Sequence, residues 1–558
     1  MNYFFDSHLH LTLKNQFSKN GNSTSPWKAI TKEDLKEGLP KLLEIFALGL
    51  IDKMFGSQSS PDLLIQGGYK MVVMPLFAPD VDLVKALSSK KIFMDLLKKY
   101  KNSRFGEVLS YERYQQLLGE VNAFSIVEND LKILPAKDPF HPDRKIVFLN
   151  SKSQWKENEP DTLFVVCSVE GIHSLRSNLQ ESHADVILQD IRQNIQKIKS
   201  QGINIVMANL THIDRNNRDF CNQAYAMDGM RVSNFDEKDL RPVDSGLTDA
   251  GKNLVDLLEE NQICTDIKHM SPQARFQLYS YRQSKGIKSP LVSSHSGLCG
   301  IPFESAQEGF KDYVYSSVKE DKCYRVRVGK PVKYKFDNFP SPGFNASTIN
   351  LFDEDVKAIY ESNGLLGISL DERVIGYTKA RRLGPDHFSA NVGGITVKNQ
   401  GRKYILTDTD FLSDHEYHDL NLFNTHRGQL LHQCADAEEL TEMIRRNSTD
   451  IPPHQFHHFL NQILHGVKLG KDLEGAKGIE KMLTQILCVG SDFDGLIEAI
   501  DWCTSCMHTK KLKDRFIKQF PKALMDNHLF LPQNWTIERI ADRLFYENGR
   551  DFVLSRLK

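Results

Sequence analysis

Eight short apolar segments constrain the fold of this protein more than any other feature. They are rich in Val, Ile, Leu and Phe, which is typical of strands buried on both faces, and most precede a stretch with helical spacing. Strands and helices that alternate predict a parallel sheet covered on both faces, and eight repeats predict an α/β fold, the closed (β/α)₈ (TIM) barrel. We expect the strands at residues 3–10, 69–77, 163–171, 203–212, 263–269, 290–295, 364–371 and 486–495.

Two long stretches interrupt this alternation, so we expect one barrel domain over residues 1–558 with insertions at about 300–348 and 376–480. The first is rich in Lys, Arg and Tyr, and its alternation around Gly329-Lys330-Pro331 predicts a β-hairpin. In the second, helices are expected near 436–484. Because both insertions leave from the same end of the barrel, we expect roles in covering the site or recognising a substrate.

Three local patterns predict further elements. Residues 35–55 are apolar on almost every side, which favours a buried helix. Residues 124–127 and 146–149 are expected to be short extended segments. Thr248 is expected to be the N-cap of a helix that runs to residue 260.

The expected strands finish on side chains that bind metal ions. Alternate residues of a strand point to the same face, so His8 and His10 project together. In a (β/α)₈ barrel the carboxyl ends of the strands build the active site. The side chains at those ends therefore predict a metal centre there: His8, His10, Glu170, His212, His269, His295 and Asp492.

Composition excludes several classes of protein. The 71 basic and 72 acidic residues nearly cancel, so charge gives no support for a nucleic-acid or membrane-surface partner. No apolar run is long enough for a transmembrane helix, and the chain opens directly into Tyr3-Phe4-Phe5 without the pattern of a signal peptide. The nine scattered cysteines favour free buried thiols. We therefore expect a cytoplasmic protein.

The order of these residues resembles that of the amidohydrolase superfamily, and within it the renal (membrane) dipeptidase family, peptidase family M19. The resemblance covers all eight expected strands, whereas the insertions have no counterpart that we can place. The matching stretches are Asp6-Ser7-His8, Val169-Glu170-Gly171-Ile172-His173-Ser174-Leu175, Leu210-Thr211-His212, Asp266-Ile267-Lys268-His269-Met270-Ser271, Ser294-His295-Ser296 and Gly490-Ser491-Asp492-Phe493-Asp494-Gly495. The stretches around Glu170 and Asp492 are specific, whereas Ser294-His295-Ser296 alone is not.

The resemblance implies a binuclear metal centre, with two divalent ions, in the first instance zinc. His8 and His10 would bind one ion, Glu170 would bridge both, and His269 with His295 would bind the second. His212 would contact the substrate or the oxyanion, and Asp492 would be the catalytic acid and base. Two such ions would activate a bridging hydroxide and polarise the scissile carbonyl.

The sequence departs from the family in two places. The family has His-x-Asp on strand one where this chain has His8-Leu9-His10, which makes the site one charge more positive. The arginine that binds the substrate carboxylate in the family is absent after His295, and Arg373, Arg325 or Arg327 is expected to replace it. These differences bear on the substrate more than on the hydrolytic chemistry.

Other candidate groups have simpler interpretations. Eight of the nineteen histidines lie between His415 and His465, within the second insertion, where their spacing fits solvated faces better than a third metal site. Cys503 and Cys506 are expected to be core thiols in a helix. Asp494 is expected to be structural, and Lys268 to point away from the metal centre.

The sequence thus predicts a zinc-dependent hydrolase that cleaves an amide bond in a small substrate, in the first instance a dipeptide. One alternative is an amidohydrolase acting on a non-peptide amide, lactone or cyclic imide. The other is a non-catalytic barrel used for binding. Neither a nucleic-acid nor a membrane partner is expected, and a homodimer is left open.

Overall fold

A computed structural model describes most of the chain. The described residues are 3–37, 55–213, 219–226, 238–244, 246–336, 341–377, 404–405, 407–422, 434–435 and 453–558. Most of the helix expected over residues 35–55 therefore lies outside them, and only α2 (Lys32–Lys36) is seen at its start.

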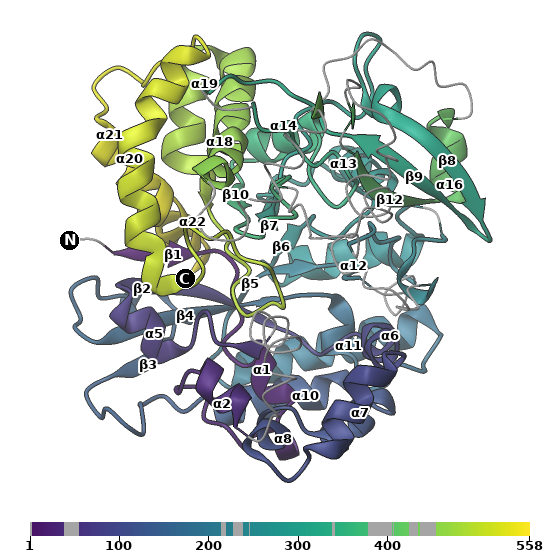
Figure 1. The fold of residues 1–558 in the computed structure, drawn as a ribbon, viewed down its shortest axis with the longest axis vertical. Helices are drawn as coiled ribbons and strands as arrows, with labels where there is room; N and C mark the ends of the chain where they lie inside the picture. The colour runs from purple at the N-terminus through teal and green to yellow at the C-terminus, as the bar shows by residue number, and fades with distance from the viewer. Residues whose placement is uncertain are drawn as a thin grey trace.

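Eight parallel strands form the expected barrel (Figure 1). Each coincides with an apolar segment identified in the sequence, although β4 begins one residue before its expected segment and β7 ends one residue after. The strands, in their hydrogen-bonded order, are β1 (Phe4–Asp6), β2 (Tyr69–Leu76), β4 (Thr162–Val169), β5 (Ile205–Asn209), β6 (Cys264–Asp266), β7 (Val292–Ser296), β10 (Leu365–Ile368) and β14 (Leu487–Val489). A ninth strand, β3 (Lys145–Phe148), pairs with the first half of β4 on the outside of this order.

The first and last of these strands meet and close the barrel. The Ser7 amide donates to the carbonyl of Val489 at 3.0 Å. Just beyond, the Asp492 amide donates to the His8 carbonyl and the His10 amide to the Phe493 carbonyl, both at 2.9 Å. His8 and Asp492 lie where these two segments pair. Two expected site residues that are far apart in the sequence therefore become neighbours.

The strands are buried on both faces, which explains their unbroken apolar sequences. Along β2, Met71 and Val73 pack with Phe5 and Val292 of other strands inside the barrel. The alternate residues, such as Val72, belong to the larger core beneath the surrounding helices.

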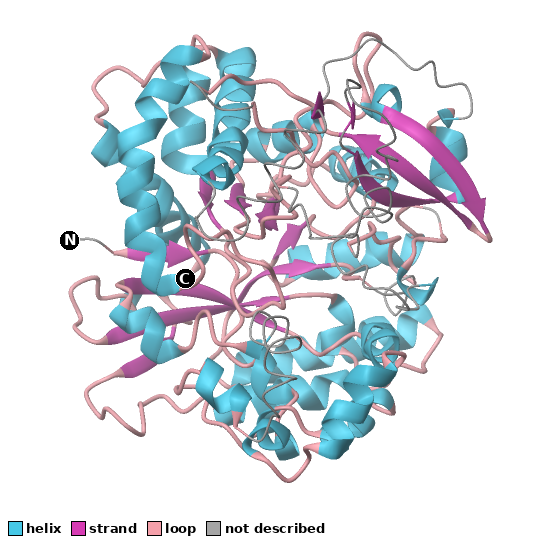
Figure 2. Cartoon of the chain, in the orientation of Figure 1, coloured by secondary structure: helices cyan, strands magenta, loops and turns pink. Residues whose placement is uncertain are grey.

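Helices surround the barrel, as Figure 2 shows. Those between or after the barrel strands are α5 (Pro61–Gln66), α6 (Val81–Ser88), α7 (Lys91–Lys99), α8 (Arg104–Val108), α9 (Tyr111–Leu118), α10 (Ala123–Ile133), α11 (Ala184–Ser200), α12 (Asp249–Glu260), α13 (Pro272–Lys285), α14 (Asp353–Glu361), α20 (Thr509–Asp526), α21 (Ile537–Asp542) and α22 (Asn548–Arg556). Thr248 caps α12 as expected, because its hydroxyl accepts from the Gly251 amide.

Two local expectations were wrong. Residues 124–127 lie in α10 rather than in an extended segment, because the Asn122 side chain accepts from the Ser125 amide and starts a helix there. Cys503 lies in a turn and Cys506 in a 3-10 turn before α20, although both are free and buried as expected.

The two insertions combine into one antiparallel sheet, seen at the upper right of Figure 1. Strands β8 (Val314–Glu320) and β9 (Cys323–Gly329) come from the first insertion, and β12 (Thr407–Ser413) of the second pairs along β9. The expected hairpin is present, but its turn was placed wrongly. The chain reverses at Asp321, which adopts φ 60°, and Gly329 instead ends the second strand.

The remaining elements of the second insertion are α16 (Asp414–Asp419), the short pair β11 (Tyr404–Ile405) and β13 (Cys434–Ala435), and helices α18 (Pro453–Glu474) and α19 (Ala476–Lys481). His465 of α18 bonds to Asp353 and Tyr334 at 2.8 and 2.9 Å, and His457 stacks on Phe336. His457 and His465 are thus buried, contrary to the expected solvated faces, whereas His415 and His418 are exposed as expected. His426 and His432 lie outside the described residues. Within the described part of the chain, no helix is long and apolar enough to cross a membrane.

Candidate metal centre

All seven side chains predicted at the strand ends meet at one mouth of the barrel. His8 and His10 follow β1, Glu170 follows β4, His212 follows β5, His269 follows β6, His295 lies in β7 and Asp492 follows β14. Six of them expose 9% or less of their surface, and the Asp492 side chain exposes 16%. The seven side chains are therefore almost completely buried.

Five imidazole rings point the same nitrogen at one carboxylate. Glu170 Oε2 lies 3.2 Å from His10 Nε2. On the other oxygen, Oε1, the Nε2 atoms of the remaining four rings converge at 3.3 to 3.5 Å: His8, His212, His269 and His295. Glu170 is thus the centre of the cluster, as the bridging role requires.

The spacing of these atoms fits metal ions. Three sets in the barrel mouth bring one ligand atom from each residue within 4.8 Å of the others: His8, Glu170 and His295; His8, His10 and Asp492; and Glu170, His212 and His269. His8 Nε2 is buried and makes no hydrogen bond with any described residue. A buried ring nitrogen without a hydrogen bond, aimed at a carboxylate, fits a ligand of a cation better than a structural residue.

Burial keeps two of the rings neutral. It lowers the pKa of His269 to about 3 and the pKa of His295 well below its ordinary value. Neutral imidazole is the form that binds a metal ion. Glu170 remains ionised, because although burial would raise its pKa, the charges of His8 and His212 and the hydrogen bond from His10 hold it well below the usual range.

Two further rings hold protons where a cation would otherwise sit. Burial would lower the pKa of His10, but its hydrogen bonds with Asp492 and Glu170 outweigh that effect and raise it to about 9. Likewise, the charges of Asp80 and Glu170 outweigh burial and hold the pKa of His212 well above its ordinary value. A metal ion would take the place of these protons on Nε2.

Asp492 stands at the edge of the cluster, 3.6 Å from His10 Nε2 and 3.9 Å from His8 Nε2. Burial raises its pKa, which suits a group that accepts and returns a proton. Its backbone φ is 61° and that of His269 is 70°. Both lie in the left-handed region, which non-glycine residues seldom adopt, and such conformations cluster at functional sites.

The loop that carries Asp492 is anchored by its neighbour two residues on. Asp494 Oδ1 lies 2.5 Å from Lys14 Nζ and 2.6 Å from the Gln58 amide. The Lys14 and Asp494 side chains expose only 5% and 7% of their surfaces. Asp494 is therefore a structural residue, as the sequence analysis expected.

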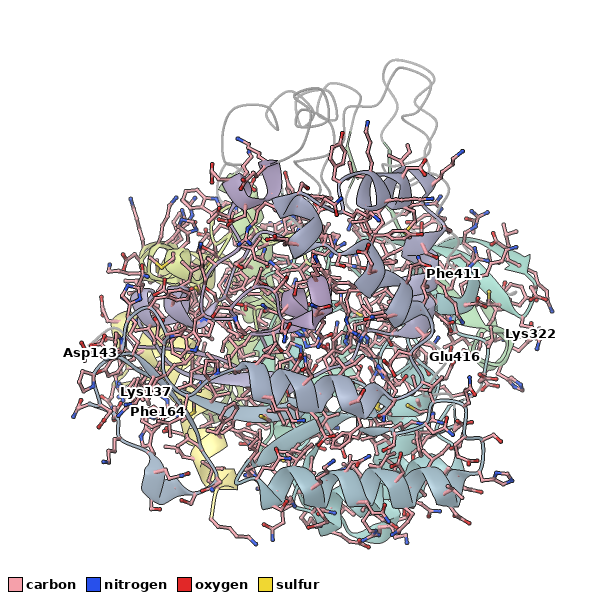
Figure 3. All side chains as sticks on the ribbon, turned by 90° about the horizontal axis from the view of Figure 1, so that it is seen from below. Lys137, Asp143, Phe164, Lys322, Phe411 and Glu416 are labelled. Carbon is pink, nitrogen blue, oxygen red and sulfur yellow. The ribbon has the colours of Figure 1, made fainter. Side chains whose placement is uncertain are left out.

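The candidate cations for a substrate carboxylate already have partners. Arg373 donates to both oxygens of Asp371 at distances from 2.5 to 3.1 Å. Arg325 lies 2.9 Å from Glu320, and Arg327 donates to Thr409 at 2.7 Å, both on the inserted sheet. Figure 3 shows Lys322, Phe411 and Glu416 of this inserted region at one edge of the molecule, opposite Asp143. The substrate role of Arg373 stays a prediction.

Lys268, the neighbour of His269, hydrogen-bonds to the backbone of another segment and not to the described side chains of the cluster. Its ammonium group is buried and donates to the Ile349 carbonyl at 3.3 Å. Burial lowers its pKa to about 8, while the nearby carboxylate of Asp492 acts in the opposite direction. A cation therefore lies within electrostatic reach of Asp492.

One residue of the site was missed. Asp80, four positions beyond the end of β2, lies fully buried with Oδ2 2.5 Å from His212 Nδ1. The available signal was that the second expected strand supplied none of the seven candidate residues, although a carboxylate follows it closely. His173, which follows Glu170 by three residues, lies beneath this loop and bonds through Nε2 to the Ala78 carbonyl at 2.8 Å.

Comparisons with known proteins give few matches. No protein-family model matches the chain, and no curated protein matches its sequence. Among solved structures, the probable dipeptidase PvdM from Pseudomonas aeruginosa is 12% identical with a TM-score of 0.42, covering 91% of each chain.

Two other solved structures match over nearly the whole length. A metallo peptidase from Rhodobacter sphaeroides, liganded with a phosphinate mimic of L-Ala-D-Ala, is 12% identical with a TM-score of 0.41, over 100% of this chain and 99% of that one. The dipeptidase AC of peptidase family M19 is 12% identical with a TM-score of 0.36, over 99% and 98%. Because these TM-scores and identities are low, we base the barrel assignment on the strand order of this chain and the functional proposal on its own site residues.

Proposed function

We propose that this protein is a metal-dependent hydrolase that cleaves an amide bond in a small substrate, in the first instance a dipeptide. The convergence of five imidazole Nε2 atoms on the Glu170 carboxylate carries the proposal. Protons on His10 and His212 account for two of these contacts, and a cation between the carboxylate and the neutral rings of His269 and His295 would prevent their lone pairs from facing its oxygens.

We assign two divalent ions to this cluster, with zinc as the first candidate, because neutral imidazoles and carboxylates form the usual ligand set of catalytic zinc. His8 and His10 would hold one ion and His269 and His295 the other, with Glu170 shared between them. When bound, such ions polarise a carbonyl and lower the pKa of water to near neutrality.

The residues of the chain would then orient the substrate and move the proton. Asp492 lies beside the cluster, is partly open to solvent and has a raised pKa, so it can take a proton and return it to the leaving amine. Because the side chains of the cluster are almost completely buried, bulk water would be excluded from the site. This exclusion strengthens the interaction of each charge with the reacting group.

Metal analysis combined with a substrate panel tests this function. We expect about two divalent ions per purified chain and hydrolysis of dipeptides that stops on chelation and returns with zinc. A panel of dipeptides, N-acyl amino acids, lactones and cyclic imides identifies the class of bond. A chain without bound divalent ions, or a loaded one inactive on the whole panel, would contradict the proposal and favour a binding role.

The Asp492→Asn variant tests the proton transfer separately. It should lower kcat by about a hundredfold or more while the metal content stays at the wild-type level. Asp130→Asn is the matched control, because it removes another buried carboxylate whose hydrogen bonds go to Thr12 and Gln16. Unchanged turnover in Asp492→Asn would remove Asp492 from the mechanism without affecting the metal assignment.

A further inference from the structure

Asp80 is a buried carboxylate whose position has no explanation in the fold alone. It precedes α6, the place of an N-cap, yet its side chain makes no capping hydrogen bond. Instead it turns inward, is 0% exposed, and places Oδ2 2.5 Å from His212 Nδ1. Burying an ionised carboxylate costs free energy, so its retention next to one ring nitrogen indicates a task for that pair.

The short loop that carries Asp80 is held from below. The Ala78 amide donates to the Ser174 hydroxyl at 3.0 Å, and the Ala78 carbonyl bonds to His173 Nε2 at 2.8 Å. Gly171 leaves room for both histidines: a Cβ there would lie 2.6 Å from His173 Nδ1 and 2.9 Å from the His212 Cβ. The carboxylate is therefore fixed before any ligand binds.

The contact decides which nitrogen of His212 is available. A carboxylate oxygen accepts, so His212 Nδ1 donates its proton to Asp80, and the tautomer with an open Nε2 is favoured. That Nε2 lies 3.5 Å from Glu170 Oε1 and forms a metal-sized set with Glu170 and His269. A carboxylate behind a histidine is the arrangement that orients metal-ligating rings.

We propose that Asp80 is a positioning residue that holds His212 as a ligand of the metal ion shared with Glu170 and His269. This assigns His212 to the metal rather than to the substrate, and it rests on the proposed function, because it presumes ions in the cluster. Among the described contacts, His8 and His269 have no hydrogen bond at Nδ1, and His295 has only the Ser294 hydroxyl at 2.9 Å. His212 is therefore oriented more firmly than these three rings.

Metal affinity in Asp80→Asn tests the proposal without relying on activity. Competition with a chromophoric chelator on the full chain should show one zinc ion bound about 10- to 100-fold more weakly, with the other unchanged. The cobalt-substituted protein should show an altered visible spectrum for the same site. Asp130→Asn, a buried aspartate that bonds to Thr12 and Gln16 and to no histidine, should match the wild type in both assays.

A second variant keeps the test decisive if Asp80→Asn folds poorly. His212→Asn should weaken the same ion if His212 is a ligand, whereas a substrate contact would leave both ions in place and raise KM. Wild-type affinity for both ions in either folded variant overturns the proposal. If the wild type itself binds no ions, the proposed function fails instead, so the two failures are distinguishable.

Discussion

The buried pair of Lys14 and Asp494 offers a quantitative test of how the mouth of the barrel is held together. Lys14 belongs to α1 (Leu13–Gln16), four residues after His10, and Asp494 follows Asp492 by two. At their separation of 2.5 Å and an effective dielectric constant of about 20, the Coulomb attraction is about 7 kcal/mol. The cost of burying both charges offsets much of it.

Removing one partner should be more harmful than removing both. Lys14→Met leaves the Asp494 charge buried without its cation, and we expect the free energy of unfolding to fall by about 3–5 kcal/mol. Asp494→Asn leaves the ammonium group without its carboxylate and should cost a similar amount. The double variant should lose less than the sum of the single losses, with a coupling energy of about 2–3 kcal/mol.

Urea unfolding, monitored by far-ultraviolet circular dichroism, measures the free energy of unfolding of the wild type, the two single variants and the double variant. The first unfolding transition is the one compared. Lys468→Met is the control, because Lys468 and Asp472 form an ion pair that is about half exposed and should contribute less than about 0.5 kcal/mol. Two results would refute the idea that this ion pair stabilises the contact between α1 and the loop after β14. One is a double variant whose loss of unfolding free energy equals the sum of the single losses. The other is a loss in Lys14→Met no larger than that in Lys468→Met.

Three further predictions concern packing, pH and metal. Gly171→Ala should reduce both stability and metal binding, because φ at this position is 70° and the new Cβ would clash with His173 and His212; thermal unfolding and zinc content measure this, and a normal metal complement would contradict it. Burial raises the pKa of Asp130 to about 7, so the folded state holds a proton that the unfolded state releases near pH 4. Stability should therefore fall between about pH 4 and pH 7, by at most about 4 kcal/mol, and Asp130→Asn should flatten that slope in urea titrations; an unchanged slope would show that Asp130 is ionised in the fold. Removing the metal should lower the unfolding temperature, and wild-type thermal stability after chelation would mean that the cluster is preformed without ions.

The sequence predicted the barrel well because each strand carries its signal locally. A buried parallel strand must be apolar along its length, and the residue just beyond it, such as Glu170 or His212, is already at the mouth of the barrel. At a strand end, the position of a residue in the sequence therefore predicts its position in the barrel. For this reason all seven expected residues lie in one cluster.

The features that the sequence missed depend on contacts rather than on local pattern. Asp80 lies four residues past its strand, and only the folded loop shows that it turns toward His212 instead of capping α6. The hairpin turn was misplaced because Gly329 is a stronger turn signal than Asp321, although pairing with β12 makes Gly329 the end of a strand. Similarly, the sequence alone does not show that Arg373 forms an ion pair with Asp371.

The seam between β1 and β14 also sets when during folding the site can exist. Hydrogen bonds there join residues 482 positions apart, as between Ser7 and Val489. His8 and His10 are therefore made long before Asp492 and β14, the strand that closes the barrel. Loop closure over such a separation is slow. The complete cluster can therefore form only after β14 has been made and has paired with β1.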